Sequence, residues 1–125
     1  MTNITKAING YINDVLDTGV IYNDEFPTPE SEGVISRHDP STAKSKTYID
    51  GSEEGTLNIA YWARYKNAAK ARETLNDIIN AIDNKKIETD EETIYTEAQT
   101  LPQFVSTDDK GYTLYTASIT AEYER

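Results

Sequence analysis

The chain has 125 residues, of which 37% are hydrophobic, no cysteine and a formal charge of −10. The length fits one domain with one core, and the lack of cysteine excludes disulfides and thiolate metal sites. The charge argues against binding nucleic-acid phosphates and against attraction to anionic membranes. No apolar run approaches the roughly 18–20 residues of a membrane span, and the N-terminus lacks the pattern of a signal peptide, so we expect the cytosol as the compartment.

The acidic charge has two interpretations. It can simply keep the protein soluble, or it can present a surface that mimics DNA or lets DNA pass without sticking. The sequence also holds nine tyrosines against two phenylalanines. Tyrosine suits half-buried sheets and wet interfaces, because its ring packs while its hydroxyl finds a polar partner.

An amphipathic helix is predicted near the N-terminus, with Asn9 and other polar residues opposite one apolar stripe. Gly10 lies within this helix, where it would mark a close packing contact. The stripe consists of Ile4, Ala7, Ile8, Tyr11, Ile12, Val15 and Leu16.

Residues 22–46 are predicted to form a loop-rich segment with an edge strand. Two prolines near its start remove backbone donors and favour extended shapes, and lysines later in it would blunt edge pairing. The expected pieces are short strands at 20–22 and 34–37, a loop at 26–33, a turn at 38–41, an edge strand at 44–50 and a turn at 50–55.

The clearest pattern is a strand that leads almost directly into a helix. Residues 57–65 alternate with period two and have one apolar face. At Asn67 the period changes to that of a helix, which is expected to run to about residue 85. Its apolar stripe consists of Ala68, Ala71, Leu75, Ile78, Ile79 and Ile82.

The C-terminal third reads as further strands. We expect an acidic turn at 88–92, a strand at 93–100 with Ile94 and Tyr95 on opposite faces, a break or bulge at Pro102, a hairpin turn at 108–111 and a long last strand at 115–123. The element order predicts a single α+β domain over residues 1–125. Its mixed or antiparallel sheet of about four to five strands would carry both helices on one face.

The sequence offers no chemistry that would indicate an enzyme. His38 is the only histidine, and it stands in a predicted turn without partners at metal-ligand spacing. The acidic clusters lack the ligand alternation of a calcium loop, and no serine or threonine has an evident base. We therefore expect no catalytic, cofactor-binding or metal site.

Aromatic residues of the central strand divide between its two faces. Tyr61 and Tyr65 fall on the apolar face and are expected in the core, whereas Trp62 falls on the other face between Ala60 and Arg64. Two roles remain open for Trp62. Either a loop covers it, or it anchors an interface with another protein.

Three segments carry a family resemblance: residues 4–16 (ITKAINGYINDVL), 56–82 (TLNIAYWARYKNAAKARETLNDIINAI) and 111–124 (GYTLYTASITAEYE). Together they resemble the tail terminator group of small minor capsid and tail-completion proteins of tailed bacteriophages. The resemblance implies a virion protein, assembled in host cytoplasm, without catalytic residues. Family members form rings, usually hexameric, that cap the tail tube, meet the head connector and let DNA through.

If the chain forms such a ring, we expect its subunits to meet through sheet edges and the loop at 22–33, since two prolines preorder that loop. Trp62 and Phe26 are the candidate subunit-interface residues. Two other functions compete with this one. The chain could be an acidic inhibitor that mimics DNA and binds a nucleic-acid enzyme, or a small non-catalytic ligand-binding domain with a pocket between helix and sheet.

Overall fold

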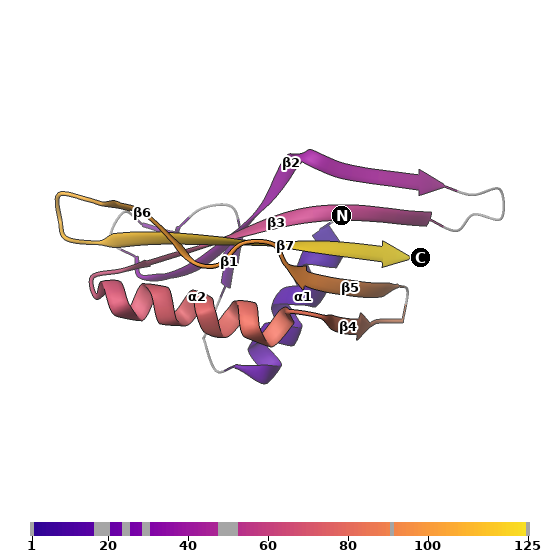
Figure 1. Cartoon of the computed structure of the whole chain (residues 1–125), viewed down its shortest axis with the longest axis horizontal. Helices are drawn as coiled ribbons and strands as arrows, with labels where there is room; N and C mark the ends of the chain where they lie inside the picture. Colours follow the sequence, from indigo (N-terminus) through magenta and orange to yellow (C-terminus); the bar gives the residue numbers. More distant parts are fainter. Residues whose placement is uncertain are drawn as a thin grey trace.

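The structure, a computed structural model, describes residues 2–16, 21–23, 26–28, 31–47, 53–90 and 92–124. These residues form two helices and one sheet (Figure 1). The elements are α1 (Thr2–Val15), β1 (Ile21–Asn23), β2 (Gly33–Thr47), β3 (Glu53–Tyr65), α2 (Ala68–Ile82), β4 (Lys85–Glu88), β5 (Thr93–Ala98), β6 (Gln103–Thr107) and β7 (Thr113–Glu124). The predicted α+β class is confirmed.

The described part of the chain forms one seven-stranded sheet in the order β1-β2-β3-β7-β5-β4, with β6 also paired to β7. Only β1 and β2 run parallel, and the other printed pairs are antiparallel. The sheet is therefore mixed, as expected, but the predicted count of four to five strands is wrong. The additional strands are short, so they carry too few residues to show a clear period.

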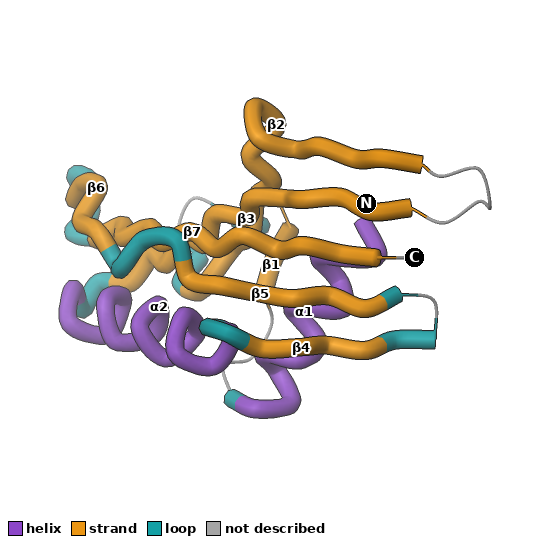
Figure 2. The backbone as a smooth tube through the Cα atoms, turned by 45° about the vertical axis from the view of Figure 1, so that its right-hand side comes forward, coloured by secondary structure: helices purple, strands orange, loops and turns teal. Residues whose placement is uncertain are grey.

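Both helices lie on the same face of the sheet, as predicted (Figures 1 and 2). There the isoleucines of α1 and the apolar stripe of α2 from Ala71 onward pack against the odd-numbered residues of β3 and β7. Ala68, the first residue of the predicted stripe, is exposed. Ala71, Leu75, Ile78 and Ile82 of α2 are all completely buried. Neither helix in the described residues is long and apolar enough to cross a membrane.

Strand β2 corrects the prediction for residues 22–46. The turn expected at 38–41 is absent, because β2 continues from Gly33 to Thr47 and pairs with β3 on both sides of an irregularity between Asp39 and Lys44. Pro40 lies within that irregularity, so its local signal coincides with a bulge in a continuing strand rather than with a turn that ends the strand. Residues 44–47 pair only with β3 among the described strands, as an edge strand would. Residues 48–50 of that predicted strand, and residues 50–52 of the turn after it, lie outside the described residues, whereas 53–55 already belong to β3.

Helix α2 begins as predicted but ends earlier. The Asn67 side chain caps it by accepting a hydrogen bond from the Lys70 backbone N–H at 3.2 Å. The helix ends at Ile82 rather than near residue 85, because Asn84, with a φ of 54°, turns the chain directly into β4. Thr96 of β5 then donates a 2.5 Å hydrogen bond to the carbonyl oxygen of Ile82. Strand β4 therefore occupies residues that the sequence assigned to the end of the helix, near residue 85, and to the start of the acidic turn at 88–92.

Three residues of α1 differ from their predicted roles. Asn9, assigned to the polar face, is buried, and Val15, assigned to the apolar stripe, is 52% exposed at the helix end. Gly10 makes no close packing contact, since nothing would lie within 4 Å of a Cβ atom there. The helical period assigns each residue to one side of the helix. Which of these residues become buried depends on how the helix crosses the sheet, and the period does not determine that.

Candidate interaction site

The sheet face away from the helices contains the candidate site. Side chains alternate along β3, so Trp62 points away from the core that its neighbours Tyr61 and Ala63 enter. In the sheet, Trp62 lies between Ile35 of β2 and Thr116 of β7. The two strands beside β3 thereby place residues of distant sequence next to Trp62.

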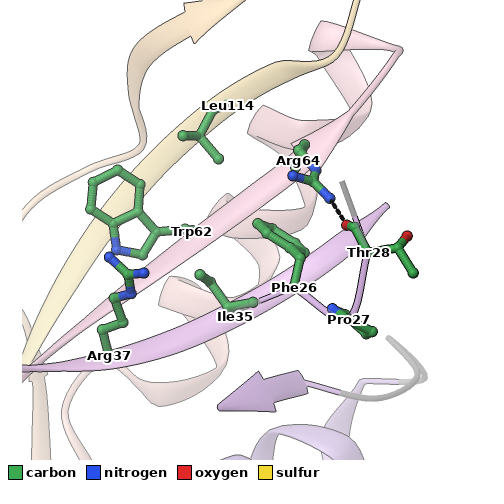
Figure 3. A pocket seen from close by; sticks show the side chains of 8 residues that line it. All are labelled: Phe26, Pro27, Thr28, Ile35, Arg37, Trp62, Arg64 and Leu114. Carbon is green, nitrogen blue, oxygen red and sulfur yellow. Dashed lines mark hydrogen bonds between the residues drawn. The ribbon is translucent and has the colours of Figure 1, made fainter. Parts of the chain in front are cut away.

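A groove of about 560 Å³ opens at this position (Figure 3). It brings together Trp62 and Phe26, the two residues that the sequence analysis named as interface candidates. The lining residues are Phe26, Pro27, Thr28, Ile35, Arg37, Trp62, Arg64 and Leu114. Nothing in the sequence pattern placed Phe26 in the same groove as Trp62, because that arrangement depends on how the proline-bearing segment lies against the sheet.

Arg64 holds that segment against the sheet. Its Nε donates a 2.7 Å hydrogen bond to the Ser31 carbonyl oxygen, and its Nη2 donates another of 2.7 Å to the Thr28 carbonyl oxygen. The guanidinium carbon also lies 4.0 Å from the centroid of the Phe26 ring. A planar guanidinium can make all three contacts at once, so Arg64 fixes one wall of the groove.

Trp62 is partly covered and partly open. The nearby Ile35 is only 4% exposed although it lies outside the helix-side core. The Phe26 side chain lies beside Ile35 in the groove (Figure 3). Trp62 itself remains half-buried, with its Nε1 atom buried and without a hydrogen-bond partner among the described residues. A buried donor without an acceptor is uncommon and costs free energy. Within the described residues, the indole N–H of Trp62 is thus a polar group whose burial is not compensated.

The groove is basic in an acidic chain. Arg37 and Arg64 both line it, and none of the described residues in the lining is acidic, whereas the chain as a whole holds 22 acidic and 12 basic residues. Figure 3 shows the Arg37 side chain reaching toward the indole of Trp62. The combination of aromatic rings and guanidinium groups suits a ligand that carries both apolar and acidic groups.

A second surface feature escaped the sequence analysis. We call residues 101–111 the β6 arm, since they comprise β6 with the segments on either side of it, and they form the end of the sheet farthest from the chain termini (Figure 1). Leu101 is 71% exposed, Phe104 59% and Val105 41%. Three of the five exposed large hydrophobic residues in the described part of the chain thus fall within the β6 arm. The expected irregularity near Pro102 occurs as a break before β6 and a register shift between Phe104 and Ser106.

The rest of the described surface offers little chemistry. A smaller hollow of about 270 Å³ lies beside Tyr95, where the ammonium group of Lys86 is 3.1 Å from the Glu88 carboxylate. No three His, Asp or Glu residues in the described ranges gather as a metal site would require. His38 lies in β2 opposite Ile59 rather than in a turn. That it has no catalytic or metal role stays a prediction.

Comparison with known proteins adds a family. A model of the family described as bacteriophage tail terminator protein matches residues 11–125, which include the groove, α2 and the β6 arm. No curated protein matches the sequence significantly.

Proposed function

The chain belongs to the bacteriophage tail terminator family, a structural and non-enzymatic family of virion proteins, and we propose that it is a ring component at the junction of phage head and tail. The observation that carries the proposal is the family match across residues 11–125. Copies of the chain would assemble in the host cytoplasm into a ring, most simply a hexamer, that contacts the tail tube and the head connector. The chain would fold as one domain over residues 1–125 and would catalyse no reaction.

The surface chemistry supports association. Exposed apolar side chains gathered on the β6 arm, and a groove containing a half-buried tryptophan, are features of interaction sites. Tryptophan and arginine are enriched among the residues that contribute most to interfaces. We propose Trp62 and Phe26 as subunit-interface residues because both line this groove.

The charge supports passage of DNA. A ring whose subunits each carry a formal charge of −10 repels phosphates and so prevents tight contacts with DNA in its channel. The same charge opposes assembly of the ring. Because salt screens this repulsion over a Debye length of about 8–10 Å, association should strengthen as ionic strength rises.

Sedimentation at low and high salt, with and without phage tail tubes, tests the proposal. We expect discrete oligomers that increase with salt or with tubes, and weaker association for Trp62→Ala. A chain that stays monomeric at high concentration, at high salt and with tubes would contradict the ring and favour the acidic-inhibitor alternative. Normal assembly of Trp62→Ala would leave the ring standing and remove only Trp62 as its anchor.

A further inference from the structure

Two surface features of the same chain, the β6 arm and the groove around Trp62, are chemically complementary. We propose that subunits meet head to tail, with the β6 arm of one copy seated in the Trp62 groove of the next. This inference rests on the proposed ring. The occupant of the groove is therefore a second copy of this chain. This contact specifies which residues meet at the ring interface.

Phe104 of the β6 arm and the groove lie on opposite sides of the sheet. Phe104 packs edge-on against Tyr115, with ring centroids 5.8 Å apart, and Tyr115 packs on the helix-side core. Trp62 and Phe26 line a groove on the other side. Phe104 therefore points away from the groove of its own subunit, and only another copy can bring a Phe104 side chain to it.

The apolar parts of the two surfaces match. The β6 arm offers Phe104 and Val105, and the groove offers the rings of Trp62 and Phe26 with Leu114 beside them. Burying exposed aromatic and aliphatic side chains against one another is the main source of affinity in interfaces.

The charged parts match as well. Asp109 lies at the tip of the β6 arm beside Asp108, whose Oδ1 accepts hydrogen bonds from the backbone N–H groups of Lys110 and Tyr112. The groove carries Arg37 and Arg64 without an acid among its described lining residues. Arg64 is engaged by the Thr28 and Ser31 carbonyl oxygens, so Arg37 is the arginine that an acidic tip would approach. Arg37 pairs with Ala60, two strand positions from Trp62, which is about 7 Å at the usual rise. Asp108 follows Val105 by three residues, about 10 Å when extended. An acidic tip can thus approach Arg37 while Val105 contacts the groove.

The geometry favours a side-chain contact over strand addition. The register shift between Phe104 and Ser106 makes Val105 the extra residue of a bulge in an edge strand. Bulges disturb the row of free backbone groups that another strand would need. A contact between two different surfaces is heterologous, and it builds a ring when the rotation between successive copies closes.

Mixing two defective subunits tests the contact. Trp62→Ala keeps the β6 arm but loses the groove's ring, and the double variant Phe104→Ser/Val105→Ser keeps the groove but loses the arm. Each should sediment as a 14.0 kDa monomer where the wild type is oligomeric. Mixed together they should form a 1:1 dimer that grows no further, because only one intact contact remains.

Fluorescence gives a second measurement on the same mixture. The chain has a single tryptophan, so all tryptophan emission comes from the groove of the arm-variant subunit. Its quenching by acrylamide should fall as Trp62→Ala subunits are added and should level off at a 1:1 ratio. Val15→Ser, which changes an exposed apolar residue elsewhere, should assemble like the wild type. Thermal melts establish that each variant is folded.

Exchanging the charges of Arg37 and Asp109 tests the contact between the groove and the tip of the β6 arm. Arg37→Glu alone and Asp109→Arg alone should each weaken association about two- to fivefold, the range for exposed ion pairs, and the double variant should recover it. If the wild type assembles but the arm variants assemble equally well, the head-to-tail contact is wrong and the ring remains. If the two defective subunits fail to pair, the groove takes a different partner. A wild type that never assembles contradicts both proposals.

Discussion

The hydroxyl of Tyr61 donates a 2.9 Å hydrogen bond to Oδ1 of Asn9, which ties the central strand to the first helix across 52 positions of sequence. Asn9 Nδ2 in turn donates to Ser36 Oγ of β2 at 3.2 Å. All three residues are buried. This short polar chain fixes how α1 crosses the sheet, since an apolar contact alone would tolerate sliding.

Replacing Tyr61 with phenylalanine should therefore destabilise the fold. The change removes only the hydroxyl and leaves Asn9 Oδ1 buried without its donor, so the free energy of unfolding should fall by about 1–3 kcal/mol. Urea denaturation measures it. Tyr95→Phe, at a 43% exposed position, is the matched control and should change little. Equal midpoints for the two variants would show that the contact does not contribute.

The stability of the fold at high pH should also depend on Tyr61. Burial raises the pKa of Tyr61 well above its ordinary value of 10.0. Because the folded state then holds the proton more tightly than the unfolded state, this contribution to stability is complete below pH 10 and is lost as pH rises above it. Denaturation midpoints measured from about pH 8 to about pH 11.5, a range that spans the ordinary tyrosine pKa, should decline less steeply at the top of this range for Tyr61→Phe than for the wild type. Parallel curves would contradict the assignment.

Leu75 should contribute strongly to packing between α2 and the sheet. It is completely buried in the core beneath the central strands, so Leu75→Ala should lower the free energy of unfolding by about 2–5 kcal/mol. A thermal or urea melt measures the change, and Asn76→Ala on the exposed side of the same helix is its control. An unchanged melt for Leu75→Ala would show that this face is not core.

The sequence predicted the elements whose apolar residues repeat with a clear period. The alternation from Leu57 to Tyr65 and the stripe of α2 each repeat several times, and both elements occur as expected. Short elements repeat too little to be recognised from their period, as for β4, where the sequence predicts a helix end and an acidic turn. At Pro40 the local signal favours a turn, and the structure interrupts the pairing of β2 with β3 between Asp39 and Lys44 and resumes it afterwards.

The candidate site was predictable only in part. Trp62 stands out because its position on β3 is opposite to the apolar face. Its partners Phe26, Ile35 and Leu114 come from three other segments of the chain. Their meeting depends on sheet register and on the contacts of Arg64, which are tertiary features that no local pattern encodes.

Two glycines should respond in opposite ways to alanine. Gly10 lies in α1 with nothing within 4 Å of a Cβ position, so Gly10→Ala should stabilise by about 0.5–1 kcal/mol. At Gly55 a Cβ would overlap the buried ring of Tyr123, so Gly55→Ala should destabilise by about 1–3 kcal/mol. Urea denaturation compares both. Adding Tyr123→Leu should remove most of the Gly55→Ala penalty, and a penalty that persists would argue against the clash.

Arg64→Lys should loosen the groove while leaving the core intact. Lysine keeps the charge but cannot donate to both the Thr28 and Ser31 carbonyl oxygens or stack its plane on Phe26. The segment that carries Phe26 should then open more often. We expect roughly tenfold faster proteolytic cleavage there, equivalent to about 1.4 kcal/mol of local stability, together with stronger acrylamide quenching of Trp62. The thermal midpoint of the whole domain should move little, because opening is confined to one wall of the groove. Arg72→Lys, on the exposed side of α2, is the control for the substitution itself. Cleavage and quenching identical to those of the wild type would mean that Phe26 and its neighbours are held by contacts other than Arg64.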